Sequence, residues 1–142
     1  MSCVEILSTD EEIIKSLKIT SAISIIAGSW SLLFEIFYFH FFKIDIYIAR
    51  VLFTIISLTI FFFSFKNISQ RVLTILIHLL IISLISSFVY TIYKIPNTLF
   101  INSQILSLLI FTTALIFSWE VKNQIIVAIY YNLLFAGSII FN

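Results

Sequence analysis

The sequence predicts an all-α fold, a polytopic membrane helical bundle of about five transmembrane helices. Hydrophobic residues make up 61% of the 142 residues and the mean hydropathy is +1.17, whereas soluble domains are about 45–50% apolar. Apolar runs long enough to cross a bilayer core of ~30 Å recur along the chain, separated by short polar stretches. Since only two glycines and one proline interrupt the chain, we expect one membrane domain.

The predicted elements follow one another with little intervening chain. Residues 1–18 are predicted to form a cytoplasmic amphipathic lead-in, because Thr9 and Glu12 fit a capping box ahead of apolar positions at helical spacing. The membrane bundle is predicted over 19–142. Its spans are expected at about 19–42, 46–65, 72–93, 98–118 and 125–141. Pro96, the only proline, lies where one helix should end and the next begin.

The first span carries its small and polar residues on one helix face. They follow one another in steps of three or four residues: Thr20, Ser24, Gly28, Ser31 and Glu35. In lipid, small residues at such spacing let two helices approach closely. We therefore predict that Ser24, Gly28 and Ser31 pack against a neighbouring helix.

Glu35 and Arg50 are ionisable residues inside predicted spans. Such a group must be neutral, paired or in contact with water. The turn between the spans places Glu35 and Arg50 at similar depths, about 12 Å and 7.5 Å of helix rise from it, so the two could form an ion pair. The alternative is that Arg50 extends to the membrane surface and Glu35 is protonated.

His78 in the third span is predicted to have a structural, hydrogen-bonded role. Proton sensing, ligand binding and haem coordination are the alternatives, but a single histidine without further ligands at suitable spacing makes a poor metal site. We therefore predict no metal and no cofactor. In the last span Ala128, Asn132 and Ala136 recur in steps of four, which predicts packing there and a hydrogen bond from Asn132 to another helix.

The charged residues bear on partners and orientation. A formal net charge of +1 gives no basic patch for nucleic acid, so the expected partner is the lipid bilayer. Five basic residues fall on the N-terminal side of the predicted spans, namely Lys15, Lys18, Lys66, Arg71 and Lys122. Three fall on the other side, namely Lys43, Arg50 and Lys94. The positive-inside rule then favours a cytoplasmic N-terminus. Because the fifth span would end outside without a charged anchor, we expect the natural protein to continue through a sixth span.

The last third of the chain resembles a known class of membrane region. The residues that carry the resemblance are Trp119-Glu120-Val121-Lys122-Asn123-Gln124, Ala128, Tyr130-Tyr131-Asn132 and Phe135-Ala136, with Leu33-Phe34-Glu35 in the first span. They resemble the N-terminal membrane region of bacterial signalling proteins, in which a bundle precedes a cytoplasmic histidine kinase, nucleotide cyclase or diguanylate cyclase. The resemblance implies a sensing or anchoring module in the bacterial inner membrane. It also implies a homodimer through the membrane domain or through a missing C-terminal part.

The functional prediction is a non-catalytic module that passes helix displacements to a missing output domain. No kinase histidine box, cyclase metal aspartates or GGDEF motif is present, so the chain itself is predicted not to be an enzyme. The candidate sensing residues are Glu35, Arg50, His78, Tyr131 and Asn132, with Trp30 as a further ring contact for an apolar ligand. Protonation or ligand binding there would favour one of two packings of the bundle.

Two other functions are alternatives for this sequence. A small transporter or channel-like protein would use the same polar residues as a pathway. The sequence shows no inverted repeat and none of the breaks inside a span that build midplane sites. An enzyme that acts on lipid would need clustered histidine or acidic residues at the membrane surface, where only Glu120, His40 and Asp45 are available.

Overall fold

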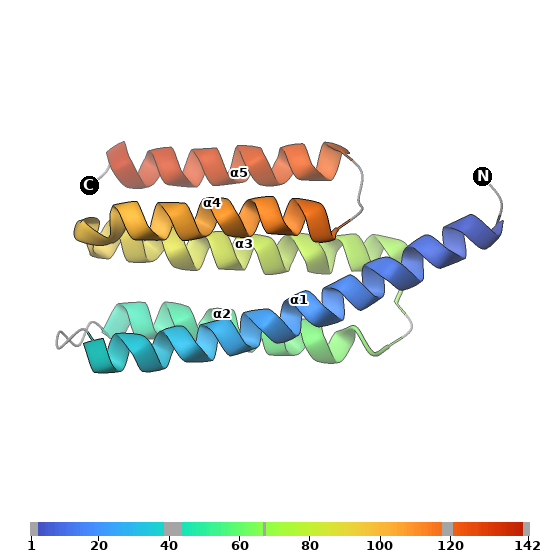
Figure 1. Cartoon of the computed structure of the whole chain (residues 1–142), viewed down its shortest axis with the longest axis horizontal. Coiled ribbons are helices and arrows are strands. Elements are labelled where there is room, and N and C mark those ends of the chain that lie inside the picture. Colours follow the sequence, from blue (N-terminus) through green and yellow to red (C-terminus); the bar gives the residue numbers. More distant parts are fainter. Residues whose placement is uncertain (1–2, 39–43, 67, 118–120, 141–142) are drawn as a thin grey trace.

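In the part of the chain that the structure describes, the fold consists of five α-helices and one short 3-10 helix (Figure 1). The structure, a computed structural model, describes residues 3–38, 44–66, 68–117 and 121–140. The elements are α1 (Cys3–Tyr38), α2 (Ile44–Phe63), α3 (Gln70–Lys94), the 3-10 helix η1 (Pro96–Thr98), α4 (Leu99–Ile116) and α5 (Val121–Ile140). The predicted all-α helical bundle is therefore confirmed.

Most of the bundle is built of helices that can cross a membrane. Among the described residues, four helices qualify by length and composition: Glu11–Leu33 within α1, and all of α2, α3 and α5. The outer surface is apolar, since side chains such as Ile55 and Ile129 are 52% and 54% exposed. Continuous apolar surface of this kind is rare on soluble monomers but is what lipid contacts. The chain is a multi-pass membrane protein.

The helix α1 joins the predicted lead-in and the first span into one element. It has 36 residues, which corresponds to about 54 Å of helix, far more than a ~30 Å bilayer core requires. Its N-terminal turns project beyond the ends of the other helices (Figure 1). The helix α4, which corresponds to the predicted span 98–118, has 18 residues and a length of about 27 Å.

The helix α3 lies at the centre of the bundle. It contacts all four other α-helices, with the antiparallel pair α1 and α2 on one side and α4 and α5 towards the other (Figure 1). It buries ten residues, whereas α5 buries three. Ile77, Ile81 and Ile85, spaced by four, are almost fully buried. The hydrophobic core therefore follows α3.

Contacts at the helix ends support the antiparallel order. At one end, Nζ of Lys94 on α3 lies 3.4 Å from Oδ2 of Asp45 in the first turn of α2. At the opposite end, Nζ of Lys18 lies 4.5 Å from the centre of the Phe65 ring. The predicted break at Pro96 is confirmed, because α3 ends at Lys94 and Pro96 is the first residue of η1.

Candidate functional site

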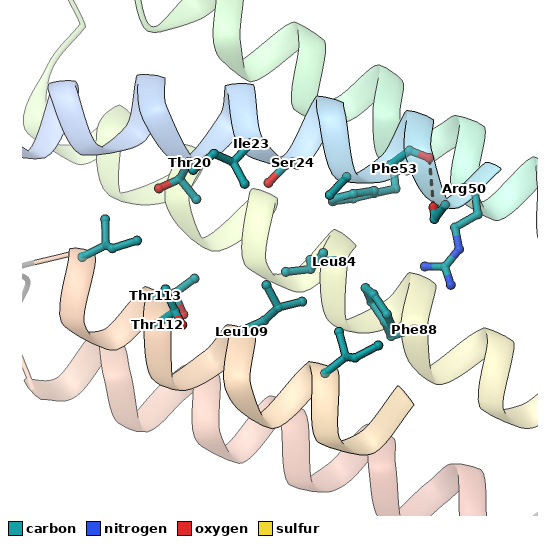
Figure 2. A pocket seen from close by; sticks show the side chains of 15 residues that line it. Thr20, Ile23, Ser24, Arg50, Phe53, Leu84, Phe88, Leu109, Thr112 and Thr113 are labelled. Atoms are coloured by element: carbon teal, nitrogen blue, oxygen red, sulfur yellow. Dashed lines mark hydrogen bonds between the residues drawn. The ribbon is translucent and has the colours of Figure 1, made fainter. Parts of the chain in front are cut away.

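A cavity of about 220 Å³ separates α1 from α4 (Figure 2). The α1 wall consists of Thr20, Ile23, Ser24, Ala27, Gly28 and Ser31, and the α4 wall of Ile105, Leu109, Thr112, Thr113 and Ile116. Leu84 and Phe88 of α3, together with Arg50 and Phe53 of α2, complete the lining. We call this cavity the α1–α4 slot. It lies where the α1–α2 pair meets the rest of the bundle.

The small-residue face of α1 is turned inward, as predicted. Ser24 and Gly28 are buried and Ser31 is half-buried. Trp30 lies on the opposite face and is 69% exposed. The packing role predicted for this stripe is thus consistent with the burial, whereas the suggested contact of Trp30 with a ligand inside the bundle is wrong, because its ring faces outward.

Gly28 lies where α1 closely approaches α2. A Cβ atom added at this position would lie 2.5 Å from Oγ1 of Thr54 and 3.4 Å from Cδ1 of Phe53. Real Cβ atoms do not approach other atoms to 2.5 Å, so only glycine fits this spacing. The same small residues that allow this approach also leave the slot open on the side of α4.

Arg50 is a buried cation at one end of the slot. Its side chain is 4% exposed. Nη1 donates a hydrogen bond to Oγ of Ser87 at 3.2 Å, and the guanidinium carbon lies 4.5 Å from the centre of the Phe88 ring. Both partners come from α3, so Arg50 points into the protein. The alternative that Arg50 extends to the membrane surface is wrong.

The predicted ion pair between Glu35 and Arg50 lies outside the described residues, since the Glu35 side chain is not described. Its backbone belongs to α1.

His78 joins α3 to α5. Its Nε2 lies 3.2 Å from Oδ1 of Asn123, a pair that requires the proton on Nε2. Two turns along α3, Oγ of Ser86 lies 2.8 Å from the hydroxyl of Tyr130. The hydrogen-bonded role predicted for His78 therefore agrees with this geometry, and its partner is a residue of α5. We call these two contacts the α3–α5 seam.

The candidate sensing residues whose side chains are described do not form one cluster. Arg50 meets α3 at Ser87, whereas His78 lies nine residues earlier on the same helix, about 13 Å away along its axis. Arg50 belongs to the slot and His78 to the α3–α5 seam. The expectation that these residues form a single polar core is therefore wrong for Arg50 and His78.

Tyr131 lies at the edge of the bundle. Its hydroxyl is 3.4 Å from Oγ of Ser107 on α4, and its ring stacks on Phe135 with centroids 5.6 Å apart. It therefore links α5 to an exposed serine of α4, packs partly buried against the hydrophobic core, and does not line the slot.

Asn132 does not bond to another helix as predicted. Its Nδ2 donates to the backbone oxygen of Ala128 at 2.7 Å, within α5. Ala128, Asn132 and Ala136 are all exposed. The packing predicted for this stripe inside the chain is wrong, because α5 turns a different face towards α3, the one that carries Asn123 and Val127.

The sequence assigned no site role to Ser87, Phe88, Asn123 and Tyr130, although Asn123 and Tyr130 are among the residues that carry the resemblance. A signal existed for Asn123 alone, since an amide near the start of a span needs a partner. The others are common residue types whose role depends on the rotation of α3 and α5 about their axes.

Among the described residues, no three His, Cys, Asp or Glu side chains lie close enough to hold a metal ion. No protein-family model matches the chain, and no curated protein or solved structure shows significant similarity to it. The class that fold and composition define is that of multi-pass helical membrane proteins.

Proposed function

We propose that this chain is a non-catalytic sensor or anchor module of a bacterial signal-transduction protein, placed in the inner membrane with its N-terminus in the cytoplasm. The observation that carries the proposal is the α1–α4 slot. A cavity between two parts of a bundle is a place where occupancy changes the distance between them. A ligand that fits one packing better than the other shifts the population towards it.

The helix α5 is the element best suited to pass on such a shift. Among the described residues, α5 makes hydrogen bonds to α3 between side chains, at His78–Asn123 and Ser86–Tyr130. Bonds of this kind in membrane helices contribute only about 0.6 kcal/mol on average. These hydrogen bonds align α5 with α3 but are too weak to hold it in one position. A modest displacement of α3 would therefore move α5. A displacement of this kind is what a signalling protein would pass on to its output domain.

The proposal includes a homodimer. Ala128, Asn132 and Ala136 form an exposed stripe on α5. Small residues four apart allow close helix contact in lipid. Asn132 also places an amide on the outer surface at mid-helix, where one N–H donates to Ala128 and lipid offers no partner for the remaining N–H and the oxygen. The same stripe of a second copy would satisfy it.

Distance measurements between spin labels test the proposed function. In a Cys3→Ser background, nitroxides at Ile26 on α1 and Leu108 on α4 report the separation of the slot walls, since both positions are exposed. We expect two distance populations in liposomes whose ratio changes with pH or with bilayer thickness. Labels at Ile26 and Ile55, within the α1–α2 pair, are the control and should keep one distance.

A single α1–α4 distance that no condition alters would contradict the sensor role. The same measurement examines Glu35. If Glu35→Gln responds to pH as the wild type does, Glu35 has no part in sensing.

A small transporter or channel is the second candidate, and Arg50 favours it. A charged residue inside a span often marks a substrate pathway, and Arg50 lines the slot. The described polar contacts lie at two separate places, the slot and the α3–α5 seam, which is less suited to a continuous path. Flux of ions or small solutes through purified protein in liposomes would decide for the transporter.

A further inference from the structure

The length of the α1–α4 slot matches one leaflet of a bilayer. On α1 the lining runs from Thr20 to Ser31, and on α4 from Ile105 to Ile116. Eleven residues of helix separate the ends of each wall, which is about 16 Å. Half of a ~30 Å hydrocarbon core is about 15 Å, the depth that one lipid acyl chain covers.

The slot presents hydrocarbon although several of its residues carry hydroxyl groups. Ser31, Thr112 and Thr113 each donate to a backbone oxygen three or four residues earlier in their own helix, at 2.7–2.9 Å. Arg50 directs its guanidinium to Ser87 and the Phe88 ring. The Thr20 hydroxyl is buried and adds no exposed polar surface. Nearly all of the surface that remains is made of methyl, methylene and ring groups, so an apolar chain fits it better than a polar solute.

One end of the slot opens beside a polar recess that contains a lysine. This recess, which we call the Lys15 recess, is lined by Glu12, Ile13, Lys15, Ser16, Ile19 and Ile116. Ile116 also lines the slot, so the two hollows adjoin. Lys15 precedes Thr20 by five residues, about 7.5 Å along α1. An ammonium group therefore lies one to two turns beyond the end of an acyl-chain-sized cavity.

We infer that the α1–α4 slot and the Lys15 recess together bind one membrane glycerophospholipid. One acyl chain lies in the slot, and the phosphate is bound by the Lys15 ammonium with the Ser16 hydroxyl beside it. Glu12, the acidic residue of the recess, limits how much negative charge the headgroup can carry there. This inference rests on the proposed function and names the ligand class of its site.

Native mass spectrometry of the protein released from nanodiscs tests the inference. The nanodiscs contain phosphatidylglycerol and phosphatidylcholine in equal parts. We expect the wild-type chain to retain one phospholipid under conditions that strip the remaining lipid. Ala27→Phe places a ring in the slot and should lower the retained fraction at least tenfold. Thr59→Phe places a ring on the exposed face of α2, away from the slot, and should retain lipid as the wild type does.

The headgroup contact has its own variant and control. Lys15→Gln should weaken retention about fivefold, which corresponds to the roughly 1 kcal/mol that one basic residue contributes at an anionic membrane surface. Lys66→Gln removes a lysine at the same end of the bundle that does not line the recess, and should have no effect on retention. If Ala27→Phe fails to fold by circular dichroism, Thr112→Phe blocks the slot from the opposite wall and replaces it.

The inference is overturned if the wild type retains no phospholipid, or if the slot-filling variant retains it undiminished. A retained mass that corresponds to a free fatty acid or to another apolar molecule would also overturn it, as would a protein dimer without lipid. These results are independent of the spin-label distances. If the separation of the slot walls responds but no lipid is retained, the sensor role is supported and the lipid site is wrong. If lipid is retained but the separation of the walls never changes, the lipid site is supported and the sensor role is wrong.

Discussion

Replacing Gly28 by alanine should loosen the contact between α1 and α2. The new Cβ atom would lie 2.5 Å from Oγ1 of Thr54. That oxygen cannot easily move away, because the Thr54 hydroxyl donates to the backbone oxygen of Arg50 at 2.9 Å. The helices must therefore separate by several tenths of an ångström over the stretch that forms one wall of the slot.

The expected magnitude follows from two opposing terms. Overpacking of a well-packed contact costs about 1–3 kcal/mol, and replacing a glycine inside a helix by alanine gains about 1 kcal/mol. The net loss should be about 1 kcal/mol. The other glycine of the chain is a matched control: a Cβ atom at Gly137 meets no atom within 4 Å. Gly137→Ala should therefore raise stability by up to about 1 kcal/mol.

Unfolding of the purified protein by sodium dodecyl sulfate, followed by circular dichroism, measures both variants. A double variant isolates the contact, since in a Thr54→Ala background Gly28→Ala should no longer destabilise. The reasoning is refuted if Gly28→Ala is as stable as Gly137→Ala, or if its effect is unchanged when Thr54 is alanine.

Three further predictions concern single contacts. The first two are measured by the same unfolding assay, and the third by energy transfer. Oγ1 of Thr20 is buried without a hydrogen-bond partner among the described residues, so Thr20→Val should raise the free energy of unfolding by about 1 kcal/mol. The control Ser21→Ala should lower it, because the Ser21 hydroxyl donates to a backbone oxygen at 2.7 Å. A loss of stability in Thr20→Val would show that the Thr20 hydroxyl is bonded. A double-mutant cycle of His78→Ala and Asn123→Ala should give a coupling of about 0.6–1.7 kcal/mol, and strict additivity would mean that the two side chains do not interact. Asn132→Leu should lower the dimer fraction measured by energy transfer between labelled copies in liposomes without changing the unfolding midpoint; an unchanged dimer fraction would place the dimer contact elsewhere.

Much of the fold could be predicted because the bilayer restricts what a chain can do. Backbone groups in lipid must be bonded within a helix or a closed barrel, so apolar runs of suitable length indicate helices, and Pro96 indicates where two of them part. The continuity of α1 was less evident. Thr9 and Glu12 fit a capping box, yet they lie inside α1, because no residue between the lead-in and the span ends the helix.

The site could be predicted only in part, because spacing identifies a helix face but not the neighbour of that face. On α1 the face with Gly28 does turn inward. On α5 two faces have helical spacing: one carries Ala128 and Asn132, and the other carries Asn123, Val127 and Ser138. The second is the buried one, a choice that depends on how α5 meets α3. The slot itself belongs to no single helix and so leaves no pattern in the sequence.

The central claim is that these helices cross a bilayer with their exposed apolar faces in lipid, and spin-label accessibility tests it most directly. Nitroxides are placed at Ile55 on α2 and Ile129 on α5, both exposed and apolar, in protein reconstituted into liposomes. The account predicts high collision rates with molecular oxygen, which concentrates in hydrocarbon, and low rates with a water-soluble nickel chelate. Ready access of the nickel chelate to both positions would contradict it.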